Sequence, residues 1–287
     1  MTPPVVRLDR HSGPGRRSPA LVLDAAASSI AGPRADNQDA ACAAPRLLAV
    51  ADGVGGKVGG GVASAVVIDR LSRMLDGAAE GAMDAVLASA VAAANAGIRS
   101  RAGSYPRWNG MATTLTAVAL GRDGSLVVAH IGDARAYLLR DGRVVQLTTD
   151  HTLVQGLVDA GVITAEQARE HPMRSILLNA LHGIEDDLAA VDVSAHRVRP
   201  GDRLLVCSDG LSGVARPETI HRILSEERRP GDAVSRLVRA ALAAGTTDNV
   251  TAVVGDVMPE GAAPSGPPVL VGAISDHERP SRTNQAC

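Results

Sequence analysis

Apolar residues recur along the chain with two different spacings, which predict strands and helices in turn. Leu21–Ile30 and Arg46–Asp52 are short apolar runs typical of strands, and the second is followed by glycines. After the glycines at 59–61, apolar residues recur at helical spacing, and a second helix is predicted from about Ala82 to Ile98. Two adjacent Ala-rich helices can form one layer over a sheet.

The middle of the chain has the pattern of hairpins. Between Thr113 and Leu147, short apolar runs are separated by GRDG, GDA and DG, and Asp-Gly between two such runs predicts a hairpin. We therefore predict an antiparallel meander. Residues from about 148 to 183 are polar and helical by comparison, and form an insertion. Strands return in AAVDVSAHRV, DRLLVCSD and NVTAVVGDV, with a helical stretch from Ala215 to Ala244 before the last of them.

This order of elements favours an α+β fold. Consecutive hairpins indicate antiparallel sheets, and the most economical layout is two sheets packed face to face with helices outside, a four-layer α/β/β/α sandwich. Residues 1–19 and 259–287 are rich in Pro, Gly, Ser and Arg and lack sustained periodicity. Both ends are predicted to be disordered tails, which leaves one domain over residues 20–258.

Composition narrows the class of protein. The chain has no Phe, one Trp and two Tyr, so its core must be built from Ala, Val, Leu and Ile. Few aromatic faces and a net charge of −2 argue against a nucleic-acid partner. Cys42, Cys207 and Cys287 form no CxxC pair, which fits a reducing cytoplasm. No signal peptide or membrane span is predicted, and we expect a cytoplasmic monomer without a membrane partner.

Four widely spaced aspartates carry the candidate chemistry. They are Asp39 in RADNQDA, Asp52 in LLAVADGVGG, Asp209 in RLLVCSDGLSG and Asp248 in GTTDNVTAVV. Asp52 and Asp209 each end an apolar run, whereas Asp248 opens one. Carboxylates that converge from strand ends make an all-oxygen site suited to hard divalent cations. Taken singly, Asp52 and Asp209 could instead be turn aspartates that bind their own backbone, and Asp248 could simply initiate a turn.

In their order, these motifs resemble the metal-dependent protein phosphatase family (protein phosphatase 2C-like), in its bacterial serine/threonine form. The resemblance runs from about Arg34 to Val254 and includes GMATT, HIGDARAYLL, LTTDHTLVQGLVDAG and HPMRSILLNALHG. It implies a binuclear Mn²⁺ or Mg²⁺ cleft at one end of the sandwich. It also implies that the insertion at about 148–183 is a mobile flap beside that cleft, where substrates could be selected.

The resemblance assigns roles to individual residues. Asp52 would bridge the two cations, the carbonyl of Gly53 would join one of them, and Asp209 and Asp248 would be further ligands of the other. Two cations that share a water lower its pKa, and the resulting bridging hydroxide would attack phosphorus in line.

The resemblance also implies roles for three other residues, each of which has another possible explanation. Asp39 would orient the attacking water, and Arg34 would grip the substrate phosphate with its forked guanidinium. Either could instead be an ordinary solvated side chain. Asp133 matches a position that, with the Asp209 equivalent, helps to bind a third, looser metal in bacterial relatives. A Gly-Asp turn in a hairpin explains Asp133 equally well.

The chain also departs from the family pattern. Val54 stands where some eukaryotic relatives have a histidine that protonates the leaving group, so water would supply that proton. Ala112 replaces the commoner glycine of GMGTT, with a modest expected effect. His151 and His171 in the insertion are interpreted as structural residues.

We expect a phosphoserine/phosphothreonine phosphatase that acts on phosphorylated proteins and opposes a bacterial serine/threonine kinase. One alternative is a dedicated switch phosphatase for a phosphorylated anti-sigma-factor antagonist. Another is a non-catalytic pseudophosphatase that only binds partners, although no metal carboxylate is missing here. Membrane-linked relatives continue into a spanning helix, whereas this chain ends in a Pro/Ser/Arg-rich segment, so we expect it to act free of the membrane.

Overall fold

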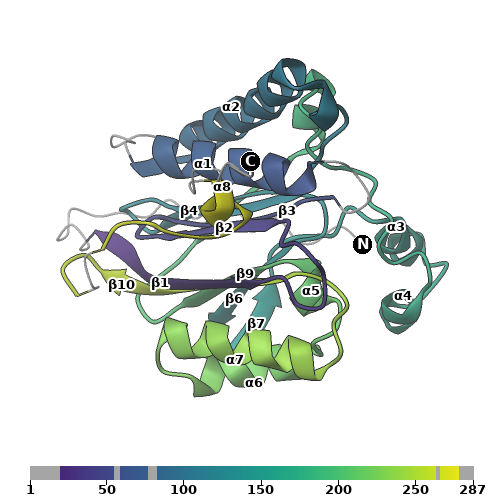
Figure 1. Cartoon of the computed structure of the whole chain (residues 1–287). Coiled ribbons are helices and arrows are strands. Elements are labelled where there is room, and N and C mark those ends of the chain that lie inside the picture. The colour runs from purple at the N-terminus through teal and green to yellow at the C-terminus, as the bar shows by residue number, and fades with distance from the viewer. Residues whose placement is uncertain (1–19, 55–58, 77–82, 263–265, 278–287) are drawn as a thin grey trace, which may run out of the picture.

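A computed structural model describes residues 20–54, 59–76, 83–262 and 266–277, arranged in four layers (Figure 1). Two antiparallel sheets form the middle layers. The five-stranded sheet contains, in order, β1 (Leu21–Ile30), β10 (Val250–Pro259), β9 (Arg203–Cys207), β6 (Arg135–Arg140) and β7 (Arg143–Gln146). The six-stranded sheet contains β11 (Val269–Gly272), β2 (Asp39–Ala44), β3 (Leu47–Asp52), β4 (Leu115–Leu120), β5 (Ser125–Ile131) and β8 (Asp192–Arg197).

A pair of helices covers the outer face of each sheet. α1 (Gly60–Asp76) and α2 (Met83–Ser104) lie over the six-stranded sheet, and α6 (Pro217–Glu226) and α7 (Pro230–Ala243) over the five-stranded sheet (Figure 1). The remaining helices are short: η1 (Pro106–Trp108), α3 (Leu153–Asp159), α4 (Ala165–Glu170), η2 (Glu185–Ala190), α5 (Asp209–Ser212) and α8 (Ala273–His277). The predicted four-layer α/β/β/α sandwich is confirmed.

The composition of the core reflects the near absence of aromatic residues from the sequence. Between the two sheets, the fully enclosed cluster consists of Ala, Val and Leu side chains, such as Leu48, Val50, Val118 and Val253. Small and branched aliphatic side chains can interdigitate at native density, so two sheets pack tightly without rings. Cys207 lies in the layer between the five-stranded sheet and its helices, fully buried, as expected of a small apolar residue.

The predicted meander between Thr113 and Leu147 is wrong in one respect. β4 and β5 form a hairpin in one sheet and β6 and β7 a hairpin in the other, so the chain crosses between sheets after Ile131. Apolar patterning could not show this, because β5 and the start of β6 are buried in a continuous run. Asp133 therefore lies in the connection that leads from one sheet to the other, and not at the tip of a hairpin.

Two strands were not predicted. β2 has the sequence DAACAA, without a β-branched residue, and therefore lacks the usual strand signal. The predicted disorder from residue 259 onward is wrong for residues 269–277. There β11 pairs with β2, and α8 then places Ala273 and Ile274 in the core under α1. Four residues of strand carry too little pattern to stand out in a Pro/Gly-rich segment. The predicted tail at 1–19 lies outside the described residues.

Candidate metal centre

The predicted site residues come from strand ends and connections of both sheets. Asp39 begins β2 and Asp52 ends β3, and the register of these strands sets the two residues directly opposite each other. Asp209 begins α5 immediately after β9, and Asp248 lies just before β10, the neighbour of β9. Asp133 occupies the crossing between β5 and β6. Pairing of strands thus brings aspartates together that are far apart in the sequence.

The carboxylates of this cluster interact electrostatically with one another. Burial raises the pKa of Asp52 well above its ordinary value, and the negative charges of Asp39, Asp209, Asp133 and Asp248 raise it further. Burial likewise raises the pKa of Asp209, with Asp248 adding the largest repulsion. Negative charges held this close together, away from bulk water, favour protons or cations among them.

Two glycines make the close approach possible. A Cβ atom on Gly53 would lie 2.4 Å from the carbonyl carbon of Gly60 and 2.9 Å from the carbonyl oxygen of Gln38. A Cβ atom on Gly210 would lie 1.8 Å from the carbonyl oxygen of Asn249. Only glycine fits at either place. The Asp-Gly pairs therefore let backbone approach backbone next to Asp52 and Asp209.

Asp39 is fully buried, and hydrogen bonds from other side chains reach only one of its two carboxylate oxygens. Its Oδ2 accepts hydrogen bonds from Ser208 Oγ at 2.8 Å and from Thr251 Oγ1 at 2.7 Å. Its Oδ1 is buried and has no hydrogen-bond partner in the described structure. Burial raises the pKa of Asp39 to about 6, although the two hydroxyl donors act to lower it. A buried carboxylate oxygen without a donor is costly unless a ligand, water or cation meets it.

The donor set suits hard cations. Carboxylate and carbonyl oxygens are the ligands preferred by Mg²⁺ and Mn²⁺. Among the described residues, no three His, Cys, Asp or Glu side chains form a ready-made metal site. Instead the carboxylates repel one another, since, in addition to burial, the negative charges of Asp39, Asp209, Asp133 and Asp248 all raise the pKa of Asp52. A divalent cation among them would offset that repulsion.

Arg34 lies at the edge of the same cluster. Its Nη2 donates to Asp248 Oδ2 at 2.8 Å and its Nε donates to the carbonyl oxygen of Thr247 at 2.9 Å. The side chains of Arg34 and Asp248 are 51% and 39% exposed. The guanidinium is therefore close to the carboxylates while part of it still faces solvent, where an anionic substrate can reach it.

Sequence reasoning missed the residues that hold the aspartates in place. Beyond Ser208 and Thr251, the backbone N–H of Asp52 donates to Thr114 Oγ1, and Thr113 Oγ1 donates to the carbonyl oxygen of Asp52. Asn249 fastens the loop before β2, because its Oδ1 accepts from the Gln38 N–H at 2.8 Å. Thr113, Thr114 and Asn249 lie in GMATT or TDN, so for these three the motifs themselves were the available signal.

The remaining predicted positions lie nearby. Val54 donates its backbone N–H to the carbonyl oxygen of Ala112 at 3.0 Å, so both departures from the family pattern share one contact beside Gly53. His151 Nε2 lies 3.0 Å from Asp192 Oδ2, and His171 Nδ1 accepts a backbone N–H in its own loop.

A large cavity adjoins the carboxylates. It measures about 620 Å³, and its lining includes Asp133 and Asp209 together with residues of α3 and α4 in the insertion. Figure 1 shows α3 and α4 at the same end of the sandwich as α5, which begins with Asp209. The insertion therefore stands beside the carboxylates, as predicted for a flap.

This chain is a four-layer α/β/β/α sandwich with acidic residues clustered at one end. That architecture is the one expected of metal-dependent phosphatases. The chain belongs to the protein phosphatase 2C family, because residues 33–250 match the sequence pattern of that family. The family resemblance found in the sequence is thereby confirmed.

Individual relatives agree with this assignment. The serine/threonine protein phosphatase PstP of Mycobacterium tuberculosis is 44% identical over 256 residues, covering 89% of this chain and 49% of PstP. The chain thus spans about half the length of this relative. The serine/threonine phosphatase stp of Listeria innocua is 35% identical over 211 residues, 71% of this chain and 82% of stp. The crystal structure of the PstP catalytic domain in complex with two manganese ions matches with a TM-score of 0.76 and 43% identity, covering 83% of this chain and 99% of that one.

None of the helices in the described ranges combines the length and the apolar character that a membrane crossing requires.

Proposed function

We propose that this chain is a metal-dependent serine/threonine protein phosphatase, a phosphoric monoester hydrolase acting on phosphoserine and phosphothreonine in proteins. The observation that carries the proposal is the convergence of five buried or half-buried aspartates with Arg34 at one end of the sandwich. Relatives named serine/threonine phosphatases, one of them solved with manganese, support it. Its targets would be proteins phosphorylated by a bacterial serine/threonine kinase.

Asp52, the Gly53 carbonyl, Asp209 and Asp248 would hold two Mn²⁺ or Mg²⁺ ions, and Asp133 with Asp209 a weaker third. Bound there, such ions lower the pKa of water and neutralise charge on the transferred phosphoryl group. Gly53 contributes only main-chain atoms, and its tight backbone packing fixes where its carbonyl points.

Arg34 and Asp39 would act directly on the reactants. Arg34 can turn from Asp248 to fork onto two phosphate oxygens, which offsets charge as the transition state forms. Asp39 is locked by two hydroxyls at Oδ2, so its free Oδ1 can accept a hydrogen bond from the attacking water and orient it. Val54 has no proton to give, so the leaving serine or threonine oxygen takes one from solvent.

We further propose that the chain acts as a cytoplasmic monomer on protein substrates, without a nucleic-acid or membrane partner. The three cysteines, Cys42, Cys207 and Cys287, form no CxxC pair, which supports a reducing compartment. The phosphatase domain would extend from residue 20 through β10, with β11 added at the edge of the six-stranded sheet and α8 packed beside α1.

The test is hydrolysis of p-nitrophenyl phosphate and of a phosphothreonine peptide with Mn²⁺, by the wild type and by Asp209→Asn. We expect the substitution to abolish both activities. In EDTA it should raise the thermal midpoint, because one repelling buried carboxylate is gone. Manganese-dependent turnover by Asp209→Asn at the wild-type rate would refute the role of Asp209. Absence of any phosphopeptide hydrolysis by the wild type would refute the function.

A further inference from the structure

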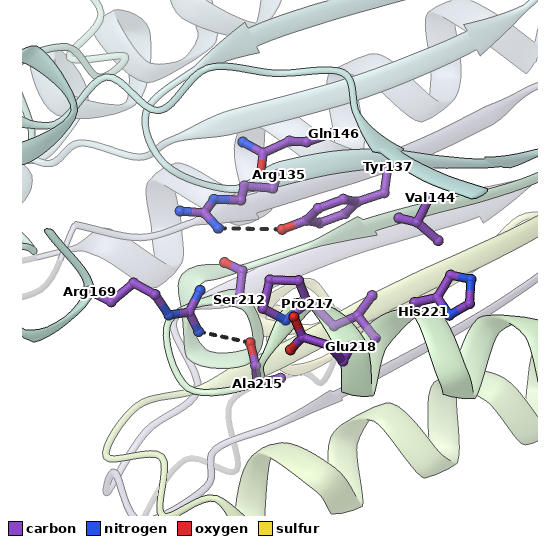
Figure 2. Close-up of a pocket in the computed structure, with 11 residues that line it drawn as sticks. Arg135, Tyr137, Val144, Gln146, Arg169, Ser212, Ala215, Pro217, Glu218 and His221 are labelled. Atoms are coloured by element: carbon purple, nitrogen blue, oxygen red, sulfur yellow. Dashed lines mark hydrogen bonds between the residues drawn. The ribbon is translucent and has the colours of Figure 1, made fainter. Parts of the chain in front are cut away.

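A second, smaller cavity lies beside the catalytic cleft. It measures about 400 Å³ and is enclosed by β6 and β7 on one side and by α5, α6 and the turn between them on the other (Figure 2). We call it the β7–α6 cavity. Its apolar lining consists of Tyr137, Val144, Ala215, Pro217 and Ile220. Its size is within the range of cavities that hold a ligand group.

The β7–α6 cavity is continuous with the cavity that reaches the carboxylates. Six residues line both: Arg135, Gln146, Arg169, Ser212, Pro217 and Glu218. Ser212 is the last residue of α5, whose first residue is Asp209. A polypeptide whose phosphorylated residue lies at the carboxylates can therefore extend a flanking side chain into the β7–α6 cavity without leaving the cleft.

The flap forms part of the wall. Arg169 of α4 reaches across the gap and donates through Nη2 to the carbonyl oxygen of Ala215 at 3.1 Å, as Figure 2 shows. α4 itself has no buried residue, so few other contacts tie it to the sandwich. A group inside the cavity would contact the sheet, α6 and the flap together.

The chemistry of the cavity favours an apolar occupant. Of the charged groups in its lining, Arg135 is already paired: its Nε and Nη2 donate to Asp150 at 2.6 to 3.1 Å. Arg135 Nη1 lies 3.4 Å from the hydroxyl oxygen of Tyr137. With that charge neutralised, the floor offers aromatic and aliphatic surface and one phenol hydroxyl.

We propose that the β7–α6 cavity is a specificity subsite that receives an apolar side chain of the phosphorylated protein, close in sequence to the phosphorylated residue. This inference rests on the proposed function, because only a protein substrate has flanking residues to place there. Burying a Leu- or Phe-sized side chain corresponds to about 10- to 100-fold in affinity. The subsite thus selects among phosphoproteins without touching the reacting phosphate.

The experiment compares wild type, Val144→Trp and Val144→Ala on phosphothreonine peptides that carry Gly, Leu or Trp at each flanking position. Val144→Trp fills the cavity and Val144→Ala enlarges it. The control is Val145→Trp, since Val145 is the next residue of β7 and is 56% exposed. p-Nitrophenyl phosphate, which has no flanking residues, reports the catalytic centre alone.

We expect the wild type to prefer an apolar residue at one flanking position by about 10-fold or more in kcat/KM. Val144→Trp should lose that preference through KM, and Val144→Ala should shift it toward Trp. Val145→Trp should resemble the wild type, and p-nitrophenyl phosphate turnover should stay unchanged throughout. The size shift in Val144→Ala keeps the test decisive even where the tryptophan variant folds poorly.

Three results would overturn the proposal. Identical peptide preferences in the wild type and both Val144 variants would remove the subsite while leaving the phosphatase function intact. An equal loss on peptides and on p-nitrophenyl phosphate would show that the cavity acts on the catalytic centre, for instance by binding a separate small ligand. A wild type that hydrolyses no phosphopeptide overturns both the subsite and the proposed function.

Discussion

The carboxylate centre and the flap lie side by side but are built in opposite ways. Asp39 and the hydroxyls of Ser208 and Thr251 that hold it are buried. In the flap, α3 has one buried residue, Val154, and α4 has none. Groups that must be fixed within fractions of an ångström stand on the strands of the sandwich. Under the proposed function, a variable substrate would meet groups on a segment whose two helices bury few residues, and such a segment can open at low cost in free energy.

The sequence distances of their contacts differ as well. Asp39 accepts hydrogen bonds from residues 169 and 212 positions away, so the centre exists only when the whole sandwich is folded. Within the flap, α4 begins with local bonds, the capping box in which Thr164 and Gln167 bond each other's backbone, and Arg169 adds one bond to Ala215 in the sandwich. Damage to the centre should therefore affect catalysis and global stability, whereas damage to the flap should stay local.

The largest effect should come from Thr251→Val, which keeps the shape of the side chain but removes one of the two donors to Asp39. Loss of such a support typically lowers activity about 10- to 100-fold. Asp39 Oδ2 then keeps only the Ser208 donor, and loss of the other buried hydrogen bond should lower the free energy of unfolding by about 1–3 kcal/mol. Steady-state kinetics and urea unfolding measure both.

Thr251→Ser is the matched control, because it keeps the hydroxyl and should retain most of the activity. Equal losses in the Val and Ser variants would show that the methyl group, and not the donor to Asp39, is what matters.

A smaller effect concerns His130, which lies between the two regions. It is buried on β5, and its Nε2 is 2.9 Å from the carbonyl oxygen of Thr149 at the start of the flap. Burial lowers its pKa from 6.5 to about 4. The folded protein thus keeps the imidazole neutral while the unfolded chain protonates it. The free energy of unfolding should fall as pH drops from 6.5 toward 4, by up to about 1.4 kcal/mol per pH unit.

Urea unfolding at several pH values in this window, on the wild type and on His130→Gln, measures this contribution. The variant should show a shallower pH slope by up to one proton. Parallel curves for the two proteins would mean that His130 has the same affinity for protons in both states.

The smallest global effect should come from Thr164→Ala in the flap. Loss of an N-cap costs a helix about 1 kcal/mol. Because α4 has no buried residue, amide hydrogen exchange in α4 should become several-fold faster while the global urea midpoint stays unchanged. A clear fall in that midpoint would place the flap in the same cooperative unit as the sandwich and would contradict the comparison.

Much of the fold was predictable because local patterns of apolar residues mark many of its strands and helices. β1 was predicted with its observed bounds. β3 was predicted to within one residue at its start, since an apolar run between an arginine and a glycine marks a strand well. β2 was missed because alanine has no strand signal of its own, and only its place between β3 and β11 makes it a strand. The crossing at Asp133 depends on which strands pair, which no single segment encodes.

The candidate site was predictable in part for a related reason. Asp-Gly at the end of a buried run limits where a carboxylate can point, and the ordered motifs matched a known family. Ser208 and Thr251 gave no comparable signal, because hydroxyl side chains serve many purposes and their partner, Asp39, is far away in the sequence. The β7–α6 cavity could not be predicted from the sequence either. Its walls come from β6, β7, α4 and α6, which meet only in the folded protein.

The central claim is that carboxylates gathered from both sheets hold the cations needed for hydrolysis of phosphoproteins. Its most direct test is anomalous diffraction near the manganese absorption edge, on crystals of protein that hydrolyses a phosphothreonine peptide with Mn²⁺. The account predicts anomalous peaks beside the Asp52 carboxylate, with the Gly53 carbonyl, Asp209 and Asp248 as further ligands. Active protein whose manganese peaks lie away from Asp52 would contradict it.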